Sequence, residues 1–298
     1  MKKILTLLIF FTTLLSCSDD SENFDLLTNT STEKNLVRIE SEGYNFAGAI
    51  AGKSVINIHS GKYQSGSTYD NDNTLRETFV QKYNSDGLCI SKEHYDAKGI
   101  RLEKKDFTIS YDAFNRISEI KEWNCVRKFT YFINNTITEL ITFTDSQNTK
   151  LSLYYLNDQG KIYKNIDSNS ITETVEFYFS GDRIMSATTK FGDFGTMDTD
   201  YTYDSNPPKG FSHQKIMTNT YGSATNAILF EGARLIEARA PLYYDNSHTS
   251  KIEYSSAIPG FTGRTDLLTY SIDSEGYTIQ SDIYSGSTYV SKSRYIYQ

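Results

Sequence analysis

Few side chains in this sequence are spaced to do chemistry together. The four histidines are His59, His94, His213 and His248, and no two of them stand two or four residues apart, as a local pair of metal ligands would. The chain also lacks the G-x-S-x-G turn of a nucleophilic serine and the G-x-x-x-x-G-K-S/T loop that binds phosphates. We therefore expect no cofactor, no bound metal and no catalytic residues that are close in sequence.

Two acidic loops carry the oxygen ligands that calcium prefers. Residues 70–73 read Asp-Asn-Asp-Asn, and Asp193, Asp198 and Asp200 lie near two glycines. The first loop does not fit the EF-hand template, because Leu75 stands where that template needs a glycine. We expect both to be solvated loops, with calcium binding as the alternative.

The N-terminus has the pattern of an export signal. Two lysines precede a mostly apolar run over residues 4–15, which is shorter than the ~20 residues of a membrane-spanning helix. Leu14, Leu15, Ser16 and Cys17 then resemble the lipobox of bacterial lipoproteins. The resemblance implies that residues 1–16 are removed and that Cys17 carries several acyl chains, which together make a stable anchor. The alternative is an ordinary signal peptide cut near Ser16.

A polar segment follows the cysteine. Residues 18–22 read Ser-Asp-Asp-Ser-Glu, which resembles the surface-export signal of Bacteroidota lipoproteins; a solvated linker is the alternative. We expect a flexible tether over 17–36 and a single folded domain over 37–298. The formal net charge is −7, and removal of Lys2 and Lys3 takes it to −9. Without a basic cluster, nucleic acid is disfavoured as a partner.

The two remaining cysteines are Cys89 and Cys125. An even pair in an oxidising compartment is compatible with a disulfide. The alternative is two buried or edge thiols that act as small apolar side chains. A metal site is not expected, because no histidine or third cysteine stands at ligand spacing.

The rest of the chain is a loose repeat of strand and turn. It contains 23 Tyr and 17 Phe but only 4 Pro, a composition that suits hydrogen-bonded strands. Each unit is an alternating strand that ends in an aromatic residue, followed by a turn of Asn, Asp and Gly and by an apolar residue. The copies lie at 83–88, 95–100, 111–117, 132–137, 155–162, 179–184, 230–235 and 270–277.

Alternation along the strands predicts one apolar face. Phe107, Ile109 and Tyr111 share a face, and so do Phe129, Tyr131 and Ile133. No long segment has a helical period, although residues 204–227 break the repeat. The ambiguous segment 47–58 contains two glycines that indicate a turn between strands.

These units predict an all-β fold, a meandering antiparallel sheet of sequential hairpins that is strongly curved, barrel-like or spiral. They resemble, in diverged form, the YD hairpin repeats of the RHS family. Tyr95-Asp96, Tyr111-Asp112 and Tyr203-Asp204 carry the dipeptide. The resemblance is best over residues 75–184, and it implies a fold and no activity.

The function predicted from these features is that of a lipid-anchored envelope protein with a binding or scaffold role and no catalysis. We expect an outer-membrane lipoprotein, facing the periplasm or exposed at the surface, with a glycan, a peptide or an envelope protein as partner. Trp123, the single tryptophan, is the candidate for ligand stacking, with packing as its alternative. The alternative function is an envelope hydrolase whose site is assembled from carboxylates distant in sequence.

Overall fold

The computed structural model describes residues 33–45, 47–146, 148–167, 173–181, 183–204, 209–231, 248–258 and 260–298. Lys34–Gln298 form one compact unit, which is distinct from Met1–Glu33. The expected signal peptide, Cys17 and most of the expected tether lie outside the described residues. The end of that tether belongs to the folded unit, because the backbone of Asn35 exchanges two hydrogen bonds with that of Gln298, at 2.7 and 2.9 Å.

The described chain is mostly β-strand. The first nine strands are β1 (Leu36–Tyr44), β2 (Ile50–His59), β3 (Lys62–Tyr69), β4 (Leu75–Tyr83), β5 (Cys89–Asp96), β6 (Phe107–Tyr111), β7 (Ile117–Glu122), β8 (Cys125–Phe132) and β9 (Thr136–Phe143). The others are β10 (Thr149–Leu156), β11 (Ile162–Asp167), β12 (Glu173–Ser180), β13 (Arg183–Phe191), β14 (Thr196–Tyr203), β15 (Thr249–Ser256), β16 (Arg264–Ile272), β17 (Thr278–Ser285) and β18 (Thr288–Tyr297). The helices are α1 (His213–Tyr221), α2 (Ala224–Glu231) and the 3-10 turn η1 (Glu103–Lys105).

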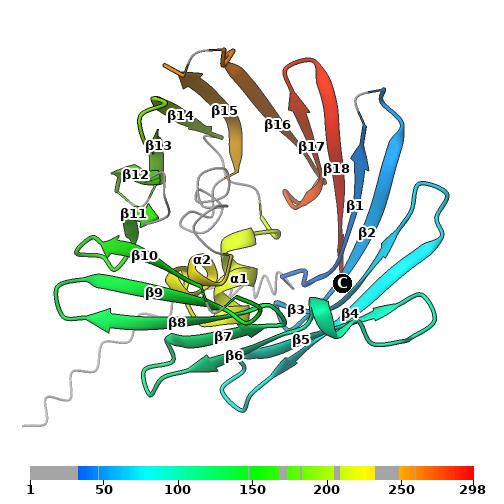
Figure 1. Cartoon of the computed structure of the whole chain (residues 1–298). Coiled ribbons are helices and arrows are strands. Elements are labelled where there is room, and N and C mark those ends of the chain that lie inside the picture. The colour runs from blue at the N-terminus through cyan, green and yellow to red at the C-terminus, as the bar shows by residue number, and fades with distance from the viewer. Residues whose placement is uncertain are drawn as a thin grey trace, which may run out of the picture. The chain divides into compact units, whose positions relative to one another are not determined.

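The strands form a closed barrel, as Figure 1 shows. Each strand pairs antiparallel with the next one in sequence, and β18 pairs with β1. The predicted all-β meander of sequential hairpins is confirmed, and closure is the form of curvature that the chain adopts. Every described strand has a neighbour on both sides, so closure removes the sheet edges on which another chain could add a strand.

Several of the hairpin turns are built by Asp and Asn side chains. Asp112 is typical: its Oδ1 accepts the backbone N–H groups of Phe114 and Arg116, at 2.9 and 3.0 Å. Asn115 then adopts a left-handed φ of 59°, which in many repeats of this chain a glycine supplies. Since asparagine also tolerates this conformation, the repeats that lack the glycine still turn. The first turn residues that act in this way are Asn45, Asn84, Asp96, Asp112, Asn157 and Asp273.

Two helices interrupt the succession of strands, and the expectation of no helix is wrong here. They lie in the segment that breaks the repeat, and the turn expected at 230–235 is wrong at Phe230, which belongs to α2. The boundaries of α1 have local causes. The Ser212 hydroxyl accepts the Lys215 N–H at the N-terminus, and Gly222, with a φ of 89°, ends the helix.

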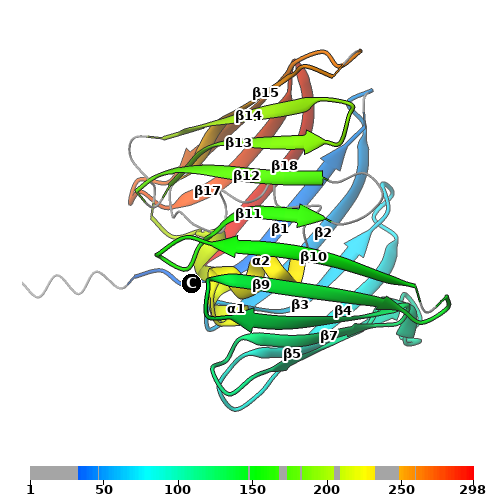
Figure 2. The ribbon, with the colours of Figure 1, turned by 60° about the vertical axis from the view of Figure 1, so that its left-hand side comes forward.

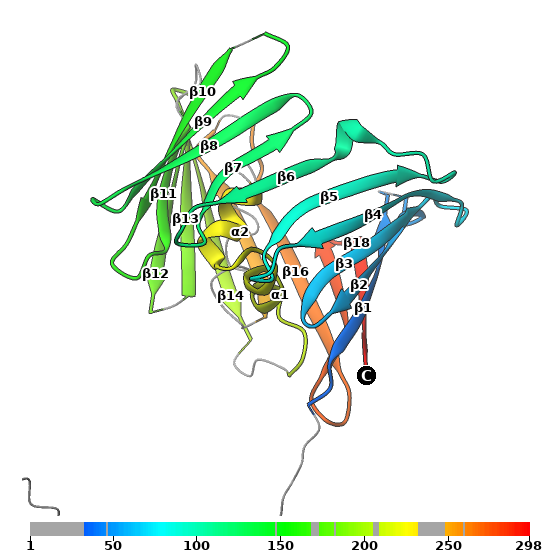
Figure 3. The ribbon, with the colours of Figure 1, turned by 90° about the horizontal axis from the view of Figure 1, so that it is seen from below.

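The helices lie within the barrel and pack against its inner wall, as Figures 1 and 3 show from two directions. Met217 and Tyr221 of α1 and Ile228 of α2 join Ile117 and Ile120 of β7 in one buried cluster. The apolar face predicted for the strands is therefore the inner face.

Of two sequence predictions near strand ends, the one for Ile133 is wrong, and the one of a turn between strands in the segment 47–58 is confirmed. Ile133, expected on the face of Phe129 and Tyr131, is fully exposed, because β8 ends at Phe132 and Ile133 lies in the turn. In the ambiguous segment 47–58, the turn closes where Gly48 bonds to Asn45, and β2 then begins at Ile50.

Candidate functional site

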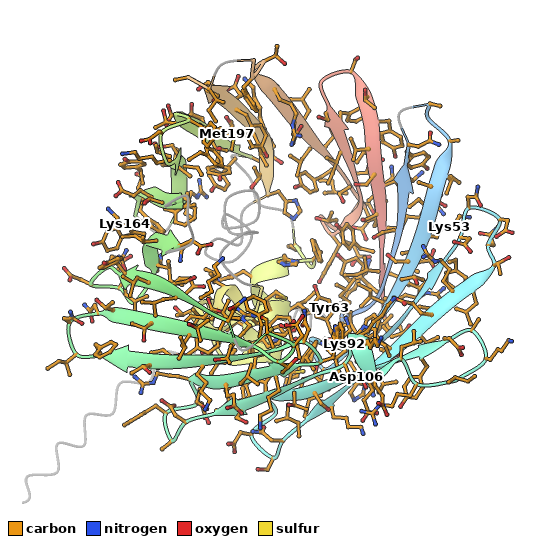
Figure 4. The ribbon with its side chains drawn as sticks, viewed as in Figure 1. Lys53, Tyr63, Lys92, Asp106, Lys164 and Met197 are labelled. Carbon is orange, nitrogen blue, oxygen red and sulfur yellow. The ribbon has the colours of Figure 1, made fainter. Side chains whose placement is uncertain are left out.

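The outer wall of the barrel carries ion pairs along the strands. Lys82 of β4 lies 2.6 Å from Glu93 of β5, and Lys121 and Lys128 both lie within 4 Å of Glu119, at 3.1 and 3.9 Å. Similar pairs join Arg38 to Glu40, Lys53 to Glu42, Lys164 to Glu176 and Lys251 to Glu253. Figure 4 shows Lys53 and Lys164 on opposite sides of the barrel. The outer wall therefore carries charged side chains, with apolar ones such as Val80 and Leu140 exposed between them.

Aromatic rings also lie on the outer wall, and one group of them is Tyr44, Tyr284 and Tyr289, with neighbouring ring centroids 4.7 and 5.1 Å apart. Phe132 of β8, Tyr155 of β10, Tyr163 of β11 and Tyr178 of β12 form a row that we call the aromatic belt. Phe132 and Tyr178 are 50% and 51% exposed, Tyr163 is 39% exposed, and Tyr155 is half-buried. Figure 2 shows the neighbouring strands β9 to β12 side by side toward the viewer.

The belt faces outward because its neighbours in sequence face inward. Side chains alternate between the two faces of a strand, and Tyr154, next to Tyr155, is fully buried inside the barrel. Phe177 is buried next to Tyr178 in the same way. Strand pairing aligns the row, because Phe132 is opposite Thr136 and Tyr155 is opposite that same threonine on the other side.

Inside the barrel, a buried ionic network ties α2 to the wall. The Nε of Arg127 lies 2.5 Å from a carboxylate oxygen of Glu139, which is 1% exposed. The two terminal nitrogens of Arg127 donate to the backbone carbonyls of Leu229 and Phe230 near the end of α2, at 2.5 and 2.9 Å. Tyr154 donates to Glu139 at 2.5 Å, and burial, followed by the Glu139 charge, raises the pKa of Tyr154. The network has a structural role, because it holds α2 against the barrel wall.

The other buried carboxylates are paired with bases as well. Asp167 contacts Lys150, and Asp266 lies 2.7 Å from Arg264. A carboxylate held by a basic side chain is a poor general acid or base partner for a second carboxylate. The described residues therefore show no pair of free, facing carboxylates of the kind that the hydrolase alternative needs.

A hollow of about 290 Å³ lies beside the start of α2. Its wall includes Arg116, which stacks on Tyr131 at 4.1 Å and pairs with Asp112 at 2.6 Å. Asn226 also lines it, and its amide already bonds to three backbone groups of the protein. Because these polar groups have partners, they do not converge on a ligand, and the hollow is weaker than the belt as a binding site.

The histidines are not brought together. His94 is nearest to an ionic cluster: its backbone N–H donates to Asp106 at 2.7 Å, and its Nδ1 lies 3.7 Å from the same carboxylate. Burial, with help from Lys92, lowers the pKa of His94, so the ring is neutral at neutral pH. Asp106 is also held by Arg101 at 2.6 Å. No group of three metal-ligating side chains occurs among the described residues.

The first acidic loop is a turn, but the loop expected around Asp198 and Asp200 is wrong, because both residues belong to strand β14 and only Asp193 lies in the turn before it. In the first, Asp72 accepts the Thr74 N–H at 2.9 Å and Asp70 lies 3.3 Å from Arg76. In the second region, Asp198 accepts the Thr188 hydroxyl at 2.7 Å on the outer wall. Calcium binding stays an untested alternative for both.

Trp123, the candidate for ligand stacking, lies between β7 and β8 and is 56% exposed. The ammonium of Lys104 lies 5.0 Å from its ring centroid, so one side of the ring already has a cationic neighbour. Trp123 is not close in sequence or strand register to the belt. The belt was not predicted, because alternation alone does not say which face of a strand is outside.

Cys89 and Cys125 are both buried, and both are free thiols. They belong to β5 and β8, which are separated in the barrel by β6 and β7, so the disulfide considered from the sequence does not form here. Burial raises the pKa of the Cys89 thiol to about 12, and burial also raises that of Cys125.

These thiols should be unreactive until the protein unfolds. With Cys17→Ser protein, we expect no maleimide labelling at pH 8 in the folded state, since the thiolate is the nucleophile and lies well below half population at that pH. In denaturant without reductant, both thiols should be labelled, as mass spectrometry would report. Denatured protein that gains no mass from the reagent would mean that a disulfide had formed.

Comparison with known proteins finds similar solved structures but no family. No family model matches the chain, and no curated protein matches it. Among solved structures, a porin-like protein from Bacteroides uniformis is similar, with 14% identity and a TM-score of 0.45 over 88% of this chain and 98% of that one. A porin-like protein from Bacteroides vulgatus has 10% identity and a TM-score of 0.34 over 89% and 99%. Neither likeness says what this chain does.

No helix among the described residues combines the length and the apolar character that crossing a bilayer would take.

Proposed function

We propose that this protein is a lipid-anchored protein of the cell envelope whose barrel stands in water and has a binding or scaffold role. The observation that carries the proposal is the distribution of charge across the wall. A Lys or Arg on the lipid face of a membrane barrel costs about 2–4 kcal/mol at the bilayer midplane. The ion pairs of Glu119, Lys82 and Lys164 lie on the outer wall, and a buried apolar cluster that includes both helices packs inside the barrel, where a pore would hold water.

The chain end supports the anchor. Asn35 pairs with Gln298, so the segment before Lys34 joins the barrel at the end where β1 begins and β18 ends. We call this end the helix end, because the connection from β14 to β15 that carries α1 and α2 starts there. Residues 18–33 span at most roughly 50 to 60 Å when extended. A lipid on Cys17 would therefore hold the helix end within that distance of the membrane.

Replacing Cys17 with serine tests the proposal. We expect the wild-type protein in the membrane fraction and the Cys17→Ser protein in the soluble fraction, folded without detergent. The reason is that, in this proposal, the lipid on Cys17 attaches the protein to the bilayer. The measurements are fractionation, labelling with radioactive palmitate, and circular dichroism of the released protein.

The Cys125→Ser protein is the matched control, and it should stay with the membrane. Cys17→Ser protein that resists a carbonate wash would contradict the lipid anchor. Released protein that aggregates unless detergent is added would contradict a barrel that stands in water.

A further inference from the structure

The hydroxyl groups of the aromatic belt differ from those of most tyrosines in this barrel. Tyrosines that pack in the wall are tied to it: Tyr111 donates to the Cys89 carbonyl and Tyr131 to the Ile117 carbonyl, each at 2.9 Å. Within the part of the chain that the structure describes, the hydroxyls of Tyr155, Tyr163 and Tyr178 have no hydrogen-bond partner. Two exposed rings, Tyr163 and Tyr178, and the half-buried Tyr155 beside them therefore keep hydroxyls that are available to a ligand.

The belt is a row with regular spacing. Phe132 and Tyr155 belong to alternate strands, so they stand about 10 Å apart along the sheet. The ring centroids of Tyr155 and Tyr163 are 6.4 Å apart, and Tyr178 lies on the next strand. From β8 to β12 the row is roughly 20 Å long. An extended chain of several sugar rings spans such a distance, and a compact small molecule does not.

The polar groups beside the rings have no net charge. Lys164 and Glu176 are cross-strand partners, their side chains are paired, and they lie one position along from Tyr163 and near Tyr178. Thr136 lies between Phe132 and Tyr155. This mixture of ring faces, hydroxyls and one neutral ion pair matches the C–H faces and hydroxyl groups of an uncharged sugar.

We infer that the aromatic belt is a binding platform for an uncharged polysaccharide, whose sugar rings stack on Tyr155, Tyr163 and Tyr178. The inference rests on the binding role proposed above and names its ligand. A bilayer is disfavoured as the occupant, because the Lys164–Glu176 pair would have to leave water with the rings. Binding of a polysaccharide to the belt does not require the lipid on Cys17. An experiment can therefore disprove the lipid anchor and the binding platform independently of each other.

The test uses full-length wild-type protein in a mild detergent and native gels that contain soluble starch, xylan, mannan or mixed-linkage β-glucan. We expect at least one polymer to retard the protein. Tyr163→Ala/Tyr178→Ala protein should bind that polymer at least about tenfold more weakly, because two stacking rings are lost. Tyr163→Phe/Tyr178→Phe protein, which keeps the rings, should bind far better than the alanine protein.

Tyr69→Ala is the matched control, since Tyr69 is an outer-wall tyrosine of β3, outside the belt. It should bind as wild type does, and all variants should keep the wild-type melting temperature. Retardation by none of the polymers would overturn the inference, and so would equal retardation of the alanine protein. Flotation with phosphatidylethanolamine vesicles that depended on Tyr163 and Tyr178 would assign the belt to a bilayer instead. A dimer that the alanine pair dissociates would assign it to a second copy.

Discussion

Replacing Arg127 with leucine should lower the free energy of unfolding by about 3–5 kcal/mol. The substitution leaves the Glu139 carboxylate charged, buried at 1% exposure and without its cation. It also removes the two donors that hold the Leu229 and Phe230 carbonyls of α2. Thermal unfolding would report the loss as a drop of roughly 10 °C in a domain of this size.

Two further variants separate charge from packing. Lys128→Leu removes the outward-facing cation next to Arg127, which is paired only at 3.9 Å to Glu119, and should change stability by less than about 1 kcal/mol. The double variant Arg127→Leu/Glu139→Leu removes both buried charges and should recover part of the loss. An Arg127→Leu protein as stable as the Lys128→Leu protein would show that the network does not anchor α2.

Replacing Asn226 with alanine should cost about 2–4 kcal/mol, since several buried groups lose their partners. Its Oδ1 accepts the buried Ile117 N–H at 3.1 Å, and its Nδ2 donates to the Asn115 and Tyr221 carbonyls, both at 2.8 Å. Asn226 therefore joins the β6–β7 turn, the end of α1 and the start of α2. Urea titration of the variant and the wild type measures the cost.

Asn219→Ala is the matched control, because Asn219 makes one longer bond, 3.3 Å, to the Gly61 carbonyl. It should cost less than about 1 kcal/mol. Asn226→Asp gives a sharper test: the shape is kept but the two donated bonds are lost, so it should destabilise the protein more at pH 7 than at pH 4, where the carboxyl group gains a proton. Equal effects of Asn219→Ala and Asn226→Ala would refute the joining role of Asn226.

The hairpins could be predicted from sequence because their causes are local. A turn such as Asp96 to Gly99 is specified by one acceptor side chain and one residue that tolerates positive φ, within four positions of each other. The buried ionic network of Arg127 could not be predicted in this way. Arg127 meets the Leu229 carbonyl across 102 residues of sequence, and nothing near Arg127 in the chain identifies that partner.

The sequence does contain signals for helix α1, but the surrounding strand pattern made them hard to recognise. Ser212 and Gly222 are an N-cap and a C-terminal stop at the right separation for α1, and Ile216, Met217, Thr220 and Tyr221 follow a helical stripe. The segment is short, and its glycine and asparagines also suit a turn. The belt was missed for another reason: Tyr154 and Tyr155 are the same residue type on opposite faces, and only the closed barrel decides which one meets water.

The seam between β1 and β18 has a consequence for how the chain reaches its native state. The first and the last strand of the barrel are direct partners, from Leu36 with Tyr297 to Gly43 with Ser291. Until β18 is available to pair, β1 therefore lacks one of its two neighbours and presents an unpaired edge. Pairing over so long a sequence separation is slow. We expect the chain to be prone to aggregation until this seam forms, and removal of β18 to be as damaging to folding as removal of β1.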